Sequence, residues 1–332
     1  MNKIKKAVGD RDGLLLHHWD TDGMVSAALI LKELENHAEF TKFTPSIGNY
    51  LLNDEDRKKI EDIDPEFTIV VDMALPEDSI NFLKKFGEVF IFDHHLQERH
   101  DVVIHHNPII NGESPKSYPS ASWVINEYIG DEPSLLSILG AFGDREQKLK
   151  ENPYAMDTIN GVLEKLDARF DEVLRCAYYL DSNYKVGDRK AVTDSPDFLK
   201  DVDYPSQILG REDLKENYED LNKAIEEESS GELEKVKDNV FYREMESPYN
   251  IISTVTRKLA WSRDGNIIIV ANSEYKEGET QVYIRGPIPD SEKIIQMVKK
   301  DGYSAGGKSD VVGMVIPTEE KNRLMDEIKN HL

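Results

Sequence analysis

The chain has 332 residues, of which 39% are hydrophobic and 32% charged, so it can bury a sizeable core and we expect two domains. The net charge of -23 argues against a protein that coats DNA nonspecifically, because that affinity comes from lysines and arginines that neutralise phosphates. A local basic groove or bound divalent cations could still hold a polyanion.

The sequence lacks the patterns that predict a membrane span, a signal peptide or an internal disulfide framework. No apolar run approaches the roughly 18–20 residues of a membrane span, and the lysine-bearing start lacks the apolar stretch of a signal peptide. The single cysteine, Cys176, excludes an internal disulfide framework and fits a reducing compartment. We therefore expect a cytoplasmic protein that does not enter a membrane.

Apolar strand patterns alternate with helical patterns in the first part of the chain. Strand patterns lie at residues 13–18, 40–47, 67–75, 87–95 and 101–108, and helical patterns lie between some of them at 23–37 and 76–86. Continuously apolar strands that alternate with helices predict an α/β fold with a parallel sheet covered on both faces. In such sheets, ligands bind beyond the carboxyl ends of the strands.

The remaining chain is first helical and then α/β again. Helical spacing extends through residues 120–182, and the highly charged segment 210–240 predicts an exposed helical connector with a possible break at 229–231. Strand and helix patterns follow at residues 266–273, 280–286, 291–302 and 310–317. We therefore predict a first domain at 1–185, a helical connector at 186–245 and a smaller α/β domain at 246–332, with few exposed aromatic side chains for stacking on bases.

Acidic and histidine side chains follow four of these segments. They are His18, Asp20, Asp22, Asp72, Asp93, His94, His95 and Asp144. Singly, such residues are more often helix caps or turn residues. Together, crowded carboxylates raise one another's pKa values unless a cation neutralises them, so the set predicts a dinuclear divalent-metal site. Oxygen and imidazole ligands without thiolate suit Mn²⁺ or Mg²⁺ and also admit Zn²⁺ or Co²⁺, and paired metals serve phosphoryl chemistry.

These residues resemble a known family. The segments HWDTDG (18–23), VVDMAL (70–75), FDHH (92–95) and GAFGD (140–144) are similar in order and spacing to the four motifs of the DHH phosphoesterases. The form of the first motif particularly resembles archaeal RecJ-like exonucleases and their relatives in the replicative helicase complex. The segment GYSAGGKSDVVGMVIP (302–317) resembles the Gly-rich signature of the associated C-terminal DHHA1-like domain.

The resemblance implies roles for individual residues. The implied metal ligands are His18, Asp20, Asp22, Asp72, His94 and Asp144, for two ions that we expect to be Mn²⁺, with Mg²⁺ or Co²⁺ possible. Three residues are implied in catalysis: Asp72 would bridge the ions, His95 would act as an acid or contact the phosphate, and Asp93 would orient an imidazole. His17 has no counterpart in the motif, and we expect a structural role for it.

Substrate contacts are implied in both domains. The candidates are His106, Arg285, Gly306, Gly307 and Lys308. Lys308 departs from the family pattern, which usually has a histidine after the paired glycines, so phosphate binding is kept while the usual histidine contact is lost. His105 and His106 have an alternative interpretation as surface loop residues. Arg285 and the glycines could likewise be an ordinary surface arginine and a solvated turn.

Three functions remain open at this stage. The leading hypothesis is a divalent-metal-dependent phosphodiesterase, an exonuclease that acts on single-stranded RNA or DNA with a hydroxide activated by two metals. The same site could act as an oligoribonuclease on short oligonucleotides, as a small-nucleotide phosphodiesterase or as a polyphosphatase. A different class of hypothesis is a docking subunit of a replication complex, whose basic protein partner would suit the acidic surface. Cleavage polarity and oligomeric state stay open.

Overall fold

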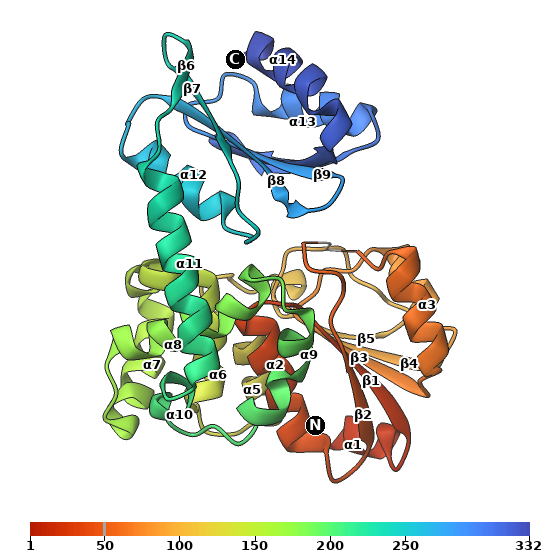
Figure 1. The fold of residues 1–332 in the computed structure, drawn as a ribbon. Helices are drawn as coiled ribbons and strands as arrows, with labels where there is room; N and C mark the ends of the chain where they lie inside the picture. The colour runs from red at the N-terminus through yellow and green to blue at the C-terminus, as the bar shows by residue number, and fades with distance from the viewer. Residues whose placement is uncertain (49–50) are drawn as a thin grey trace. The chain divides into compact units, whose positions relative to one another are not determined.

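The structure, a computed structural model, describes residues 1–48 and 51–332, and these divide into two compact units (Figure 1). Unit 1 contains residues 1–184 and 188–217, and unit 2 contains residues 185–187 and 218–332. No helix within the described ranges is long and apolar enough to cross a membrane.

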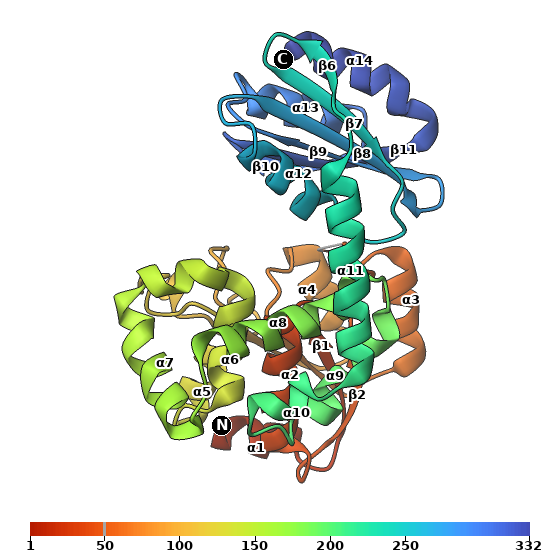
Figure 2. The ribbon, with the colours of Figure 1, turned by 60° about the vertical axis from the view of Figure 1, so that its left-hand side comes forward.

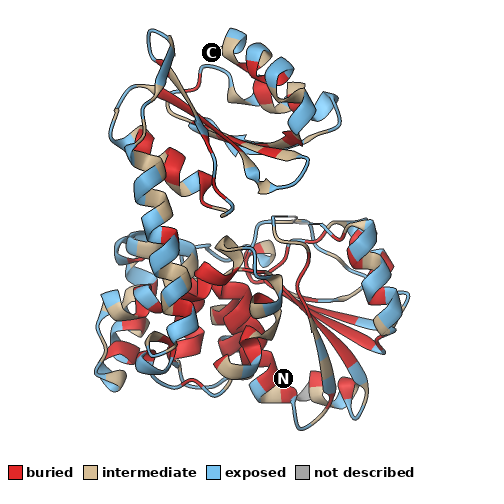
Figure 3. Cartoon of the chain, in the orientation of Figure 1, coloured by how far each residue is buried: buried red, intermediate tan, exposed pale blue. Residues whose placement is uncertain are grey.

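Unit 1 is built on a parallel sheet. Its strands are β1 (Asp12–His17), β2 (Glu39–Phe43), β3 (Phe67–Val71), β4 (Glu88–Phe92) and β5 (Ile104–His106). They form a five-stranded sheet in the order β2-β1-β3-β4-β5. Every residue of β3 is buried, as are all but the first residues of β1 and β4 (Figure 3). The predicted α/β class with a parallel sheet is confirmed, and burial on both faces explains why these strands are continuously apolar.

Helices cover the two faces of this sheet. On one face, α3 (Asp54–Ile63) and α4 (Glu77–Leu83) share an apolar cluster with β1, β3 and β4. On the other, α2 (Thr21–Leu34) packs on β1 and β3 and against α5 (Ala121–Ile129) and α6 (Leu135–Arg145). The further helices of unit 1 are α1 (Asn2–Val8), η1 (Ile109–Asn111), η2 (Glu146–Glu151), α7 (Pro153–Leu166), α8 (Phe170–Lys185), α9 (Arg189–Leu199) and α10 (Pro205–Leu209).

Unit 2 is built on a second sheet. Its strands are β6 (Glu234–Lys237), β7 (Val240–Met245), β8 (Ile267–Lys276), β9 (Glu279–Arg285), β10 (Ser304–Lys308) and β11 (Val311–Pro317), in the order β10-β11-β9-β8-β7-β6. One face packs on α12 (Ile252–Trp261) and the other on α13 (Ser291–Lys300) and α14 (Lys321–His331), which η3 (Thr318–Glu320) precedes. A second, smaller α/β fold is therefore present, as the sequence predicted.

The segment expected to be a helical connector differs from the prediction at its end. The helix α11 (Glu212–Ser230) ends inside the predicted break at 229–231, but β6 and β7 follow it and pair in the sheet of unit 2. The helical expectation for 234–245 is therefore wrong. The prediction failed because β6 is a largely exposed edge strand. Its charged residues hide the alternation of apolar and polar side chains that identifies a strand. The division between the units also falls within α11, between residues 217 and 218.

Two helices approach each other closely where α2 meets α6. Gly140 of α6 faces Asp22 of α2 and Ser122 of α5, and a Cβ atom at position 140 would overlap Asp22 Oδ1 and Ser122 Oγ. Only glycine leaves room for that carboxylate, so packing explains the first glycine of the GAFGD segment, Gly140.

We predict that Gly140→Ala lowers the free energy of unfolding by about 1–3 kcal/mol, because the added methyl group displaces a buried carboxylate or separates two helices. Gly161→Ala is the matched control, since Gly161 lies exposed within α7 with open space around its Cβ position. That change should stabilise the protein by about 0.5–1 kcal/mol. Urea denaturation measures both, and equal effects would contradict the close approach.

Candidate active site

Three motif residues directly follow neighbouring strands of the sheet. The register places the last residues of β1, β3 and β4 side by side. The residues that follow them directly in the chain are His18, Asp72 and Asp93. They lie at the carboxyl edge of a parallel sheet, which is where the sequence placed them.

The beginning of α2 fixes two further carboxylates. Asp20 is the N-cap of α2, and its Oδ1 accepts a backbone N–H of the first turn at 3.1 Å while its Oδ2 lies 2.8 Å from His18 Nδ1. Asp22 is fully buried, and its oxygens accept the backbone N–H groups of Ala121 at 2.6 Å and Ser122 at 3.0 Å at the start of α5. Helix starts therefore hold both side chains in place.

His94 lies among three carboxylates from different elements. Its Nε2 atom is 3.1 Å from Asp144 Oδ2, 3.5 Å from Asp72 Oδ1 and 3.7 Å from Asp22 Oδ2. These side chains come from the end of α6, the end of β3 and the start of α2. The structure thus brings together residues that are far apart in the sequence.

Asp72 lies between two groups of ligand atoms. Its Oδ2 is 3.7 Å from His18 Nδ1, while its Oδ1 faces His94. Its backbone has a φ of 58°, in the left-handed region that non-glycine residues rarely adopt and that occurs preferentially at functional sites. The groups in which ligand atoms lie within 4.8 Å of one another are Asp72–His94–His95, His18–Asp20–Asp72 and Asp22–His94–Asp144.

The electrostatics of this cluster favour the binding of cations. Burial raises the pKa of Asp22, and the charge of Asp144 raises it further, to about 6. Burial and the charges of Asp22 and Asp20 raise the pKa of Asp72 well above its usual range. Burial opposes protonation of His94, but the carboxylates of Asp144 and Asp72 outweigh it and raise its pKa to about 12. Without a metal, protons must reduce the repulsion.

The donor atoms also fit a divalent cation. Within the described part of the chain, Asp72 Oδ1 and His94 Nδ1 are buried without a hydrogen-bond partner. Such atoms are costly unless a water or an ion satisfies them. The donors are oxygen and imidazole nitrogen, whereas the thiol of Cys176 is buried in α8 and directed at the carbonyl of Pro205. This donor set suits Mn²⁺ or Mg²⁺.

A network of polar side chains orients His95. Asp93 Oδ1 accepts a hydrogen bond from His95 Nδ1 at 2.8 Å, and Gln97 donates to the other oxygen of Asp93. The fully buried Asn107 donates to the carbonyl of His95 at 2.8 Å. Burial opposes protonation of His95, but Asp93 outweighs it and raises the pKa of His95. His95 is therefore held with its side chain half exposed and its Nδ1 atom 3.8 Å from Asp72 Oδ1.

Sequence reasoning missed three of the supporting residues. Asn107 and Gln97 hold the Asp93–His95 pair, and Asp181 of α8 accepts hydrogen bonds from both the backbone and the hydroxyl of Thr21 at the start of α2. Asn107 had a signal, because it follows directly on β5 at the same edge of the sheet. Gln97 and Asp181 had none.

The other histidines lie apart from the carboxylate groups. His17 is fully buried, its ring within 3.0 Å of the Thr44 hydroxyl, and burial lowers its pKa to about 4. His105 and His106 are not loop residues, as one interpretation had them, but lie on β5 because the short run IHH pairs with β4. His106 packs against Phe92 and Tyr128, and no metal-type group within the described ranges includes it.

The predicted substrate residues of unit 2 come together at one end of its sheet. Lys308, the last residue of β10, pairs with Val311 of β11, and Val311 pairs with Arg285 at the end of β9. A Cβ atom on Gly307 would overlap the β11 backbone, whereas Gly306 has open space beside it. The glycines therefore belong to a strand and not to a solvated turn.

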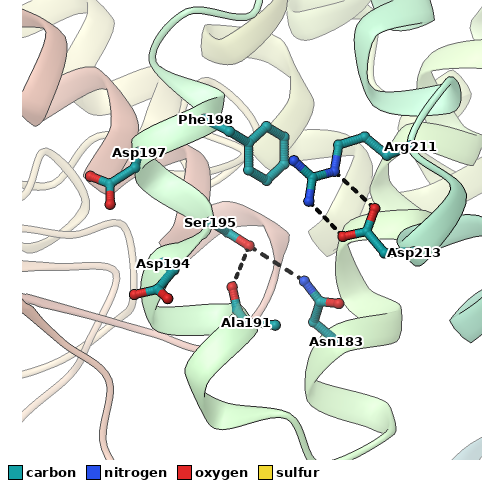
Figure 4. A pocket seen from close by; sticks show the side chains of 8 residues that line it. All are labelled: Asn183, Ala191, Asp194, Ser195, Asp197, Phe198, Arg211 and Asp213. Carbon is teal, nitrogen blue, oxygen red and sulfur yellow. Dashed lines mark hydrogen bonds and ion pairs between the residues drawn. The ribbon is translucent and has the colours of Figure 1, made fainter.

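A separate cavity of about 420 Å³ lies in unit 1 between α8, α9 and the start of α11 (Figure 4). Arg211 stacks on Phe198 at 4.5 Å and pairs with Asp213, and Asn183 donates to the hydroxyl of Ser195. None of the predicted site residues lines this cavity. Its arginine is already paired, so the cavity offers no uncompensated charge for an anion.

Comparisons with known proteins agree with this arrangement. The family model described as "DHH family, N-terminal domain" matches residues 14–153. No curated protein matches the sequence. The fold is similar to that of RecJ from Thermus thermophilus in complex with Mn²⁺, with a TM-score of 0.70 at 14% identity, over 99% of this chain and 53% of that chain. This chain therefore spans about half the length of that RecJ.

Two further structures have a similar fold. An exonuclease RecJ bound to manganese gives a TM-score of 0.69 at 14% identity, over 99% of this chain and 92% of that chain. A pGpG-specific phosphodiesterase from Vibrio cholerae, PggH, gives a TM-score of 0.50 at 15% identity, over 96% of this chain and 98% of that chain.

We predict that Asp22 contributes stability to the metal-free protein at about pH 4 that is lost by about pH 7. A carboxyl group whose pKa is higher in the folded than in the unfolded chain stabilises the fold below both values, and this stabilisation is lost as the pH rises through the folded value, about 6 for Asp22. The loss from Asp22 should be about 1–3 kcal/mol. Urea denaturation with a chelator, at both pH values, measures it.

Relative to the unaltered protein, Asp22→Asn should lose less stability or gain more between about pH 4 and 7, whereas Asp157→Asn, which removes an exposed carboxyl group from α7, should follow the unaltered protein. The comparison is made between variants because burial also lowers the pKa of His17 to about 4, which adds stability over the same pH range. Added Mn²⁺ should stabilise the unaltered protein more at about pH 7 than at about pH 4, because a cation binds the deprotonated carboxylates. The same slope in all three proteins would contradict the assignment.

Proposed function

We propose that the chain is a divalent-metal-dependent phosphodiesterase, an exonuclease acting on single-stranded RNA or DNA, because its residues 14–153 match the model of the DHH family N-terminal domain. The observation that carries this proposal is the convergence of Asp22, Asp72 and Asp144 on His94 at the carboxyl edge of the sheet. The fold similarity to the two manganese-bound RecJ structures supports the same assignment.

The proposed metal ligands fall on both sides of Asp72. His18 and Asp20 would hold one ion, His94, Asp22 and Asp144 would hold the other, and Asp72 would contribute an oxygen to each. Two divalent cations, preferably Mn²⁺, would lower the pKa of a water molecule and stabilise charge on the phosphate when bound. The residues of the chain fix this geometry before substrate arrives, since each carboxylate is anchored by a strand end or a helix.

His95 is the proposed acid or phosphate contact. Its ring is half exposed, lies next to Asp72, and is oriented through Nδ1 by Asp93. The raised pKa keeps the ring protonated over more of the neutral range, so it can donate a proton or a hydrogen bond to a phosphate oxygen. Asp93 is a positioning residue in this proposal.

Unit 2 is the proposed DHHA1-like substrate-binding domain, with residues 246–332 as its functional part. Arg285 and Lys308 would contact phosphates, and Gly306 leaves room for a backbone to approach. His106 remains a proposed substrate contact in unit 1, near the end of β5.

A second candidate substrate is a short oligonucleotide or a small nucleotide. It is favoured by the fold similarity to the pGpG-specific phosphodiesterase, which extends over nearly all of both chains. A docking subunit of a replication complex is the third hypothesis. The retention of every motif aspartate favours catalysis over a purely structural role.

With Mn²⁺, the protein should cleave end-labelled single-stranded RNA or DNA, and Asp72→Asn or His94→Ala should lower kcat by at least about 100-fold, because each removes a proposed metal ligand. Substrates of several lengths separate the candidates: cleavage of only the shortest favours the small-nucleotide activity. No cleavage of any length, with less than one ion bound per chain, would contradict the proposal.

The two adjacent histidines provide a control for the first motif. His18→Ala should abolish metal-dependent cleavage. His17→Gln should largely retain it, because His17 is directed at the Thr44 hydroxyl and not at the carboxylates. Equal losses would show that the register of the motif is assigned wrongly.

Asp93→Asn should lower kcat by about 10- to 100-fold with little change in KM. It should also lower the pKa of His95, whose protonated ring is the acid, so the loss of activity at high pH should begin at a lower pH. The pH profile of kcat measures this shift. A reduced kcat with an unshifted profile would mean that Asp93 is needed only for folding.

A further inference from the structure

Trp261 exposes most of its indole ring on unit 2. Its exposed fraction is 71%, whereas Trp19 is 4% exposed and Trp123 is partly buried. Trp261 is the last residue of α12, and the guanidinium of Arg257 lies 5.4 Å from the centre of its ring. The sequence predicted few exposed aromatic side chains in this domain, and Trp261 is an exception that burial in a core does not explain.

The chain topology places Trp261 at the same end of the sheet as Arg285. After α12, the chain makes a tight turn in which the N–H of Asn266 donates to the carbonyl of Arg263 at 3.2 Å. β8 begins with the next residue, and its second residue, Ile268, pairs with Arg285. Since α12 covers β8 and β9, the end of the helix lies by the end of β9 (Figure 2).

Side-chain alternation places these groups on the same face. Tyr283 belongs to the apolar cluster beneath α12, and Ile284 belongs to the cluster on the opposite face. Arg285 therefore lies on the α12 face, because side chains alternate along a strand. Lys308 and Arg285 both pair with Val311, so Lys308 is on this face too.

This end of the sheet is open and locally rich in cations. Lys308 is exposed and forms no ion pair with any residue in the described ranges, and open space lies beside Gly306. Arg263 donates to a serine hydroxyl and pairs with no carboxylate within those ranges. The acidic residues of the two turns are Asp264 and Asp310, of which Asp310 lies 3.7 Å from Arg285. The chain as a whole has a net charge of -23, which suits a basic partner. The basic side chains at this end of the sheet instead complement a polyanion.

We propose that Trp261 is a stacking platform for an unpaired base of single-stranded nucleic acid, with Arg285 and Lys308 on the neighbouring phosphates. The substrate class rests on the proposed function, but the site lies wholly within unit 2. Aromatic rings beside a cationic groove bind single strands in this way, because every base has a face to stack on and every phosphate a charge to neutralise. Such stacking tolerates all sequences.

The test compares two ligands that differ only in their bases. The full-length protein, kept in chelator to prevent cleavage, is titrated with oligodeoxythymidine and with an abasic oligomer of the same length, and tryptophan fluorescence and anisotropy of the labelled oligomer are recorded. Trp261→Ala should weaken binding of oligodeoxythymidine by roughly 5- to 100-fold and leave the abasic oligomer within about twofold. Trp261→Phe should restore part of the difference.

Two controls separate stacking from other effects. Tyr154→Ala removes an aromatic ring of similar exposure, 66%, from α7 in unit 1 and should change neither affinity. Lys308→Gln should weaken both ligands alike and reduce the salt dependence of binding, because it removes a phosphate contact.

Equal affinities of the Trp261→Ala variant and the unaltered protein for both ligands, or equal losses for both, would overturn the proposal. The outcome is independent of catalysis, because no metal is present. If Trp261→Ala loses affinity only for the oligomer with bases, and the protein cleaves nothing, the stacking site is supported and the phosphodiesterase is refuted. Metal-dependent cleavage without any base-dependent loss of affinity would support the phosphodiesterase and refute the stacking site.

Discussion

The arrangement of unit 1 depends on holding several carboxylates close together where little water reaches them. Asp22 and Asp72 are almost fully buried, and both lie within 4 Å of His94. Their mutual repulsion is strong at low dielectric and would separate mobile side chains. The chain resists it by giving each carboxylate its own anchor: the end of a central strand for Asp72 and the N–H groups of a helix start for Asp22.

The need to anchor these carboxylates explains three features of the chain that take no direct part in a reaction. The positive φ of Asp72 is an unfavourable conformation that the surrounding sheet maintains. Gly140 lacks a side chain because the Asp22 carboxylate occupies the space where a Cβ would be. Asp181 fixes the first turn of α2 from a helix more than a hundred residues further along the chain. The ends of rigid elements therefore carry the site, since even His94 and His95 lie within three residues of the end of β4.

The sequence predicted the parts of this arrangement that leave a periodic or local signature. Continuously apolar strands predicted the parallel sheet, and residues directly after them, such as His18 and Asp72, were expected at its carboxyl edge. Contacts made across the chain left no such signature, which is why Gln97 and Asp181 were not identified. Strand β6 was missed because an edge strand with exposed charged residues lacks the alternation that identifies a strand. The exposure of Trp261 also leaves no signature in the sequence, because an aromatic residue at the end of a helical pattern looks the same whether it is buried or exposed.

The charge distribution bears on how such a chain can select a polyanion. A net charge of -23 repels nucleic acid at long range, so little of the affinity can come from nonspecific neutralisation of phosphates. Under the two proposals, affinity comes from short-range groups: cations at the carboxylate cluster of unit 1 and, separately, the few basic side chains and the exposed ring of unit 2. Few phosphate contacts imply that affinity falls only gently with salt, since the slope scales with the number of phosphates neutralised. An acidic surface therefore does not conflict with the proposed nucleic-acid substrate, because the groups proposed to bind it act at short range.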